Sequence, residues 1–169
     1  LISIVDTFAQ FGTTKGNLPL IMSSLSEAPI ICLFSHTGFQ DAADGASHQS
    51  TTYLGAISGI PHVSCVVVSC REEAEALMSK AVENIARERE AGKSANSVVF
   101  FYGREKYPIS FGSNYNWGEA SVIKEGADIT VVTCGPFVQK AVNVHNKLIM
   151  DGISVEVINN PFANSPDTS

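Results

Sequence analysis

The chain of 169 residues is 44% hydrophobic and 17% charged, a composition that supports a packed core and excludes a disordered protein. Its 11 lysines and arginines against 17 aspartates and glutamates give a net charge of −6, which argues against a general nucleic-acid or anionic-membrane surface. No apolar run approaches the ~20 residues that span a bilayer, and no signal peptide is visible. The four cysteines include no C-x-x-C spacing, so a cytoplasmic protein with reduced thiols is expected.

Short apolar runs alternate with helical patterns along the first part of the chain, as in an α/β domain. Strands are predicted at residues 1–5, 30–34, 63–69 and 97–102. Helices are predicted at residues 18–25, 50–60 and 70–91. Glu72 and Glu73 stand at the favourable end of the last helix dipole. The continuous apolar runs are typical of buried parallel strands, so we expect a mostly parallel sheet flanked by helices over residues 1–106.

The last part of the chain predicts the start of a second α/β domain. Residues 107–118 are rich in glycine, asparagine and aromatic residues without periodicity, which indicates a linker. Over residues 119–169 the predicted elements are strands at 120–123, 129–134 and 155–158 and a helix at 137–150. The last two strands and the helix form a βαβ unit. Because the chain begins with Leu1 inside a predicted strand, we expect a fragment or a subunit that lacks sequence upstream.

The best candidate for chemistry is the loop Phe34–Gln49, F-S-H-T-G-F-Q-D-A-A-D-G-A-S-H-Q. It follows the carboxyl end of a predicted strand, where ligands bind in open α/β sheets, and long loops tend to be functional. It carries two histidines and two aspartates. Ser47 is a candidate N-cap, which would place His48 in the first turn of the next helix with Asp44 close by. Either Asp44 and His48 serve chemistry, or they only cap the loop and the helix.

Two further features could serve a ligand. Phe8 and Phe11 are three residues apart and can share a face, which suits either an ordinary core or the flat face of a neutral heteroaromatic ring. Arg104 follows a predicted strand at the same carboxyl edge as the loop. It could form an exposed ion pair with Glu105, or its guanidinium could bind the oxygens of a phosphate.

The segment D-G-A-S-H-Q at 44–49, after a strand ending in S-H at 35–36, resembles the pyrimidine-binding domain of the transketolase family. The resemblance covers most of the chain. Further similar segments are V-D-T-F-A-Q-F at 5–11, I-P-H-V at 60–63, Y-G-R at 102–104 and, for the C-terminal domain, residues 127–158.

This resemblance implies a thiamine-diphosphate-binding fold and the transfer of a two-carbon ketol unit between phosphorylated sugars. The site residues that it implies are Phe8 and Phe11 for the pyrimidine ring, His36 and Arg104 for the sugar phosphate, and Asp44 and His48 for substrate hydroxyls and catalytic proton transfer. The family often has a third aromatic residue where this chain has Thr14.

The resemblance also implies partners. The domain that binds the diphosphate and a divalent metal (Mg or Ca) is absent from these residues, and so is the glutamate that activates the pyrimidine. We therefore expect the chain alone to be inactive and to need a homodimer or a partner chain carrying that domain. One alternative is an enzyme like deoxyxylulose-phosphate synthase, which His36 at the strand end disfavours. Another is a non-catalytic assembly subunit of the same fold, which Thr14 favours.

Overall fold

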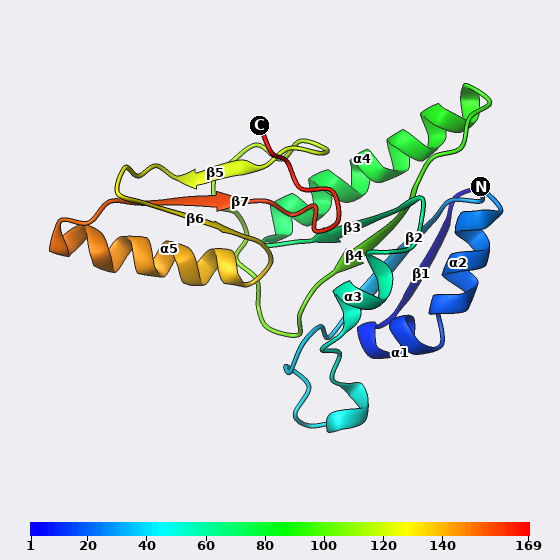
Figure 1. Ribbon diagram of the computed structural model, residues 1–169, viewed down its shortest axis with the longest axis horizontal. Coiled ribbons are helices and arrows are strands. Elements are labelled where there is room, and N and C mark those ends of the chain that lie inside the picture. Colours follow the sequence, from blue (N-terminus) through cyan, green and yellow to red (C-terminus); the bar gives the residue numbers. More distant parts are fainter. The chain divides into compact units, whose positions relative to one another are not determined.

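The computed structural model describes all residues from Leu1 to Ser169. They form two compact units, one of Leu1–Val66 with Met78–Glu105 and one of Val67–Leu77 with Lys106–Ser169. Each unit is built around its own sheet, of four strands in the first and three in the second (Figure 1). No helix combines the length and hydrophobicity that crossing a bilayer requires. The α/β fold class is thus confirmed, whereas the domain limits at 106 and 118 stay predictions.

The sheet of the first unit has the strand order β1-β2-β4-β3. Its strands are β1 (Ser3–Phe8), β2 (Ile30–Ser35), β4 (Ser97–Phe101) and β3 (Val63–Val67). β2 pairs in parallel with both β1 and β4, which confirms the predicted parallel arrangement. All five residues of β4 are buried, whereas four of the six in β1 are exposed. The apolar centre of this sheet therefore holds the carboxyl ends of β2 and β4 in fixed positions.

The helices associated with the first unit begin with one that the sequence did not predict. They are α1 (Ala9–Thr14), α2 (Asn17–Leu25), α3 (Tyr53–Ile57) and α4 (Arg71–Glu90), the last running through both units (Figure 1). The sequence predicted no helix between the strand at residues 1–5 and the helix at residues 18–25. Instead, Gly12 lies in α1 against the ring of Phe34, where a Cβ atom would come within 2.4 Å of Cζ. The glycine serves close packing of a helix on β2, not a turn.

The predicted helix 50–60 is wrong in extent. Residues Ala46–His48 form a separate 3₁₀ turn, η1, and α3 begins only at Tyr53. The physical reason lies at Ser50, whose backbone N–H donates to Gly38 O at 3.1 Å and whose carbonyl accepts from Gly38 N at 2.7 Å. A residue bonded in this way across a loop cannot also be helical. Ser47 is consequently no N-cap, and its Oγ instead lies 3.0 Å from Nδ1 of His48.

The second unit contains the βαβ arrangement that the sequence predicted. Its elements are β5 (Ser121–Lys124), β6 (Ile129–Thr133), α5 (Phe137–Leu148), the 3₁₀ turn η2 (Ile149–Asp151) and β7 (Val155–Asn159). β7 lies between β5, to which it is antiparallel, and β6, to which it is parallel. α5 packs on this sheet through a core of Ile123, Val138, Ala141, Val142, Val155 and Val157. His145 is structural, because it is buried and its Nδ1 donates to Val155 O at 2.5 Å.

Candidate functional site

Four aromatic rings from three segments gather where β1 and β2 end. Phe8 is the last residue of β1 and Phe11 lies in α1, with ring centroids 6.1 Å apart and planes inclined by 15°. His36, directly after β2, packs its ring 4.0 Å from Phe8. His48, in η1, stands edge-on to Phe11 at 5.0 Å and to Phe8 at 5.8 Å. The structure thus brings together four of the six residues that the resemblance implied, here called the aromatic cluster.

The two histidines of the aromatic cluster are held in the same way. Nδ1 of His36 lies 2.9 Å from Ser35 Oγ, and Nδ1 of His48 lies 3.0 Å from Ser47 Oγ. Neither Nε2 atom has a hydrogen-bond partner, so each can donate to a ligand or accept from one. His36 also has a backbone φ of +58°, which is uncommon for a residue other than glycine and costs about 1–3 kcal/mol. Strained residues cluster at active sites and ligand sites, so the strain at His36 is compatible with a binding role.

Asp44 lies apart from these contacts. It is exposed, and its carboxylate forms no hydrogen bond or ion pair within the chain. Gly45 follows it with a φ of +78°, which gives the loop its turn. Neither η1 nor α3 has a side-chain cap, so the capping interpretation of Asp44 and His48 is wrong. Their catalytic roles stay predictions.

Arg104 follows β4, and its partner is not the one that the sequence suggested. Nη1 donates to Oδ1 of Asp41 at 2.5 Å. Asp41 is completely buried, whereas 47% of the Arg104 side chain is exposed. Glu105 bonds elsewhere, accepting at 2.8 Å from Nε2 of Gln40. No hydrogen bond or ring contact joins Arg104 to His36, so their predicted convergence on one phosphate stays a prediction.

Gln40 and Asp41 together attach the loop to the end of β4. Besides its bond to Glu105, Gln40 accepts from the backbone N–H of Arg104 at 2.6 Å. The approach is so close that a Cβ atom on Gly103 would come within 2.0 Å of Gln40 Oε1. Sequence reasoning counted Asp41 among the polar residues of the loop but gave it no role. Only the absence of a side chain at Gly103 hinted that something packs there.

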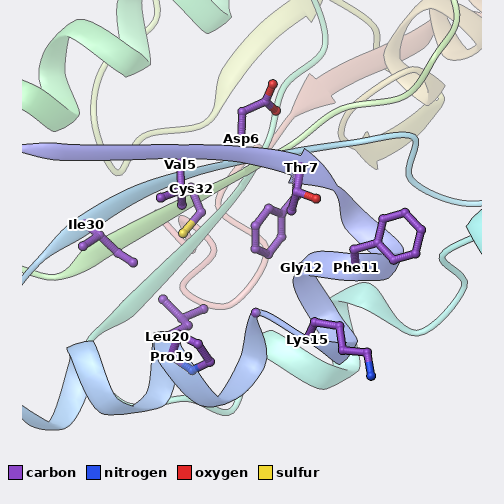
Figure 2. A pocket seen from close by; sticks show the side chains of 12 residues that line it. Val5, Asp6, Thr7, Phe11, Gly12, Lys15, Pro19, Leu20, Ile30 and Cys32 are labelled. Carbon is purple, nitrogen blue, oxygen red and sulfur yellow. The ribbon is translucent and has the colours of Figure 1, made fainter.

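A pocket of about 380 Å³ opens between β1 and the helices α1 and α2 (Figure 2). Phe11, a member of the aromatic cluster, also lines this pocket. In Figure 2 the side chains of Pro19, Leu20 and Cys32 surround the same space. Most of the lining is apolar, namely Val5, Phe11, Pro19, Leu20, Ile30, Cys32 and Phe34. A volume of this size is within the range of small-molecule sites, roughly 300–1,000 Å³.

A second polar cluster lies in the other unit, around Glu73 in the first turn of α4. Glu73 is completely buried. Its Oε2 accepts from the N–H of Ser69 at 2.6 Å and from Ser69 Oγ at 2.7 Å, and its Oε1 accepts from Asn159 Nδ2 at 2.6 Å. Burial raises the pKa of Glu73 above its usual 4.5, and these hydrogen bonds lower it part of the way. Glu73 thus lies in the first turn of α4, as the sequence predicted, and its burial and hydrogen bonds are additional features that the helix pattern did not predict.

The chain brings no three histidine, cysteine, aspartate or glutamate side chains together in a way that could hold a metal ion. Its own residues therefore do not fit a divalent cation. All four cysteines are free thiols, and Cys32, Cys65 and Cys70 are buried. The chemistry available at the aromatic cluster is that of two imidazoles beside aromatic faces, with a half-exposed guanidinium on the same unit.

Comparison with known families identifies the family to which the chain belongs. Residues 1–109 match the family model described as the transketolase pyrimidine binding domain, and residues 118–169 match that of the transketolase C-terminal domain. The chain belongs to the transketolase family. The resemblance that rested on the D-G-x-x-H-Q segment is thereby confirmed for most of the chain.

Individual relatives differ in their activities. The chain is 25% identical over 142 residues to 1-deoxy-D-xylulose-5-phosphate synthase of Clostridium acetobutylicum, covering 82% of this chain and 21% of that protein. It is 26% identical over 172 residues to human transketolase-like protein 2, covering 98% of this chain and 25% of that protein. A split gene transketolase, solved as an inactive beta4 tetramer, superposes with a TM-score of 0.77 at 24% identity over 95% of this chain and 49% of that one. The chain therefore spans a quarter or less of these two curated relatives' lengths.

Proposed function

We propose that the chain supplies the pyrimidine-side half of a thiamine diphosphate site in an enzyme that transfers a two-carbon ketol unit between phosphorylated sugars. The observation that carries the proposal is the aromatic cluster at the carboxyl edge of β1 and β2. Thiamine diphosphate, when bound, supplies the carbanion chemistry that amino-acid side chains cannot provide. The residues of this chain bind and orient the cofactor and the substrate, and they exchange protons with the substrate.

The residues fit the pyrimidine ring of the cofactor in their chemistry. Phe8 is half-buried, and Phe11 keeps 39% of its surface exposed although it is aromatic and beside an apolar pocket. An exposed aromatic face next to an apolar space favours a flat, neutral heteroaromatic ring. We therefore assign Phe8 and Phe11 to the contact with the pyrimidine.

We assign the polar groups to the substrate. His48 holds or moves a proton at its free Nε2, and proton transfer of this kind accelerates a reaction by a factor of roughly 10²–10⁴. The edge-on contact with the ring of Phe11 orients the imidazole. The exposed carboxylate of Asp44 accepts from a sugar hydroxyl. Nε2 of His36 and the guanidinium of Arg104 bind the sugar phosphate.

The remaining parts of the enzyme lie outside these residues. We propose that the complete protein forms a homodimer, or pairs with a partner chain, and so brings a domain that binds the diphosphate through Mg or Ca to these residues, as an arrangement over separate genes would allow. Cytoplasmic location rests on the free thiols. The second candidate function is that of a deoxyxylulose-phosphate synthase, because a protein of that name is among the relatives.

The test uses the complete protein with thiamine diphosphate and magnesium. Ketol transfer between sugar phosphates supports the proposal, whereas formation of 1-deoxyxylulose 5-phosphate alone supports the second candidate. Calorimetry gives a readout that needs no turnover: Phe11→Ala should raise the Kd for thiamine diphosphate about tenfold, by loss of an aromatic contact. Phe39→Ala is the matched control, because Phe39 is 76% exposed and lies outside the aromatic cluster. Equal Kd values for the two variants would remove Phe11 from the site.

A further inference from the structure

The ion pair between Asp41 and Arg104 joins groups in different surroundings. Oδ1 of Asp41 accepts from Nη1 of Arg104 at 2.5 Å, and the carboxylate is completely buried. Nearly half of the Arg104 side chain is exposed, and its Nε and Nη2 have no hydrogen-bond partner. The guanidinium is therefore held from inside by a carboxylate and open on its other side. A ligand oxyanion can reach that open side.

Asp41 depends on Arg104 for its stabilisation. Its second oxygen, Oδ2, is buried and has no hydrogen-bond partner. The same is true of Oγ of Ser50, further along the loop. A buried charge without other donors keeps its only cation close, because separating the pair would leave the carboxylate uncompensated. Asp41 consequently stays beside Arg104 when a ligand arrives.

The charge around Arg104 is therefore not positive. Asp41 balances the guanidinium, and the carboxylate of Glu105 is fixed nearby through Gln40. Asp41 is shielded from solvent, so salt screens its charge far less than that of the exposed Glu105. A phosphate dianion on Nε and Nη2 is attracted by one cation and repelled by a carboxylate on the same guanidinium. An uncharged sugar end meets no such repulsion.

We propose that Asp41 is a specificity-determining residue, an internal anion that neutralises Arg104 and lowers its affinity for the phosphate end of a sugar. The inference rests on the proposed function only in that Arg104 is taken to face the substrate phosphate. If Asp41 merely positioned Arg104, removing its charge would weaken phosphate binding. The two roles thus predict opposite signs for one substitution.

The test is Asp41→Asn in the complete protein, which removes the charge and keeps the shape. KM for fructose 6-phosphate and Kd for inorganic phosphate should both fall about tenfold, the lower end of what a charged hydrogen bond is worth. KM for fructose should stay unchanged. Glu105→Gln removes the exposed carboxylate and should tighten phosphate by about twofold at most. Gln40→Ala loosens the loop without changing charge and should not tighten phosphate.

Three results would overturn the proposal: weaker phosphate binding in Asp41→Asn, unchanged phosphate binding, or an equal change for fructose and its phosphate. Should Asp41→Asn not fold, Asp41→Ser, which leaves room for water in place of the carboxylate, carries the same expectation. Binding of inorganic phosphate needs no turnover. Tighter phosphate without ketol transfer would therefore refute the proposed function and leave the role of Asp41 intact.

Discussion

Asp41 and Glu73 are both completely buried carboxylates, yet the chain stabilises them in different ways. Asp41 in the first unit pairs with the cation of Arg104 and leaves one oxygen without a partner. Glu73 in the second unit forms no ion pair and accepts three hydrogen bonds from the neutral groups of Ser69 and Asn159. Burial alone therefore does not distinguish a structural carboxylate from one that acts on a ligand. The two differ here in whether their hydrogen-bond partner is exposed to solvent.

The two regions differ in what a ligand can reach. Arg104 is half-exposed, so a ligand can touch the partner of Asp41. Ser69 and Asn159 are as buried as Glu73 itself, so no ligand reaches that cluster. The loop also carries backbone strain at His36, whereas Glu73 sits in a regular helix. We infer that changes around Glu73 alter stability and that changes in the loop alter function.

The largest effect should come from Glu73→Ala. It would leave the N–H and Oγ of Ser69 and the amide of Asn159 buried without an acceptor, at about 1–3 kcal/mol for each unsatisfied group. We expect a total loss of about 3 kcal/mol in the free energy of unfolding, measured by urea denaturation of the complete protein. Glu75→Ala, which removes an exposed ion pair with Arg71, should cost less than about 1 kcal/mol. Similar losses of unfolding free energy in Glu73→Ala and Glu75→Ala would show that the buried cluster around Glu73 contributes no more to stability than an exposed ion pair.

The pH dependence of stability sharpens the same contrast. The pKa of Glu73 is raised by burial, so the folded protein holds this proton at pH values where the unfolded chain, with a pKa near 4.5, releases it. The contribution of this proton to the free energy of unfolding is fully present below pH 4.5. It is lost as pH rises through the folded-state pKa, and the free energy of unfolding then falls by at most about 1.4 kcal/mol per pH unit. Glu73→Gln should remove this decline, which begins above pH 4.5.

Thermal unfolding of the two proteins across that range gives the measurement. Other groups, such as Asp167, whose pKa is lowered to about 2, titrate alike in both proteins and cancel in the difference. Parallel stability curves for the wild type and Glu73→Gln would show that Glu73 binds its proton equally well in the folded and the unfolded protein, and that burial does not raise its pKa.

Much of the fold could be predicted because it depends on local patterns. Apolar runs and helical spacing identified the strands of both sheets and the long helix α4. The errors came from contacts between distant segments. Gly12, in α1, packs on Phe34 of β2. Ser50 pairs with Gly38, so the following helix, α3, is shorter than predicted. No local pattern contains either contact.

The candidate site divides in the same way. Phe8, Phe11, His36 and His48 were named from motifs, and the structure gathers their rings. Asp41 was not recognised because its partner Arg104 lies 63 residues away in sequence. Glu73 has one partner, Ser69, only four residues away, but its other partner, Asn159, lies 86 residues away. Motifs find the residues that a family shares. Buried charges become visible only when the fold has placed their partners.

The smallest change in stability should accompany a large change in function at His36. His36 and His62 both have a positive backbone φ, of +58° and +56°, and His62 is exposed and outside the aromatic cluster. Replacing either by glycine relieves the strained φ but raises the entropy of the unfolded chain by about 0.5–1 kcal/mol. These terms oppose each other. We therefore expect both variants to stay within about 1 kcal/mol of the wild type in urea denaturation.

Turnover should separate the two variants. His36→Gly removes the ring that packs on Phe8 and the free Nε2, so ketol transfer should fall at least about tenfold, as for the loss of a charged or proton-exchanging contact. His62→Gly should keep full activity, because its side chain touches no part of the cluster. A loss of stability above about 2 kcal/mol in His36→Gly alone would mean that the ring holds the loop together. The loop would then be architecture like the surroundings of Glu73, and the strain at His36 would need no ligand to explain it.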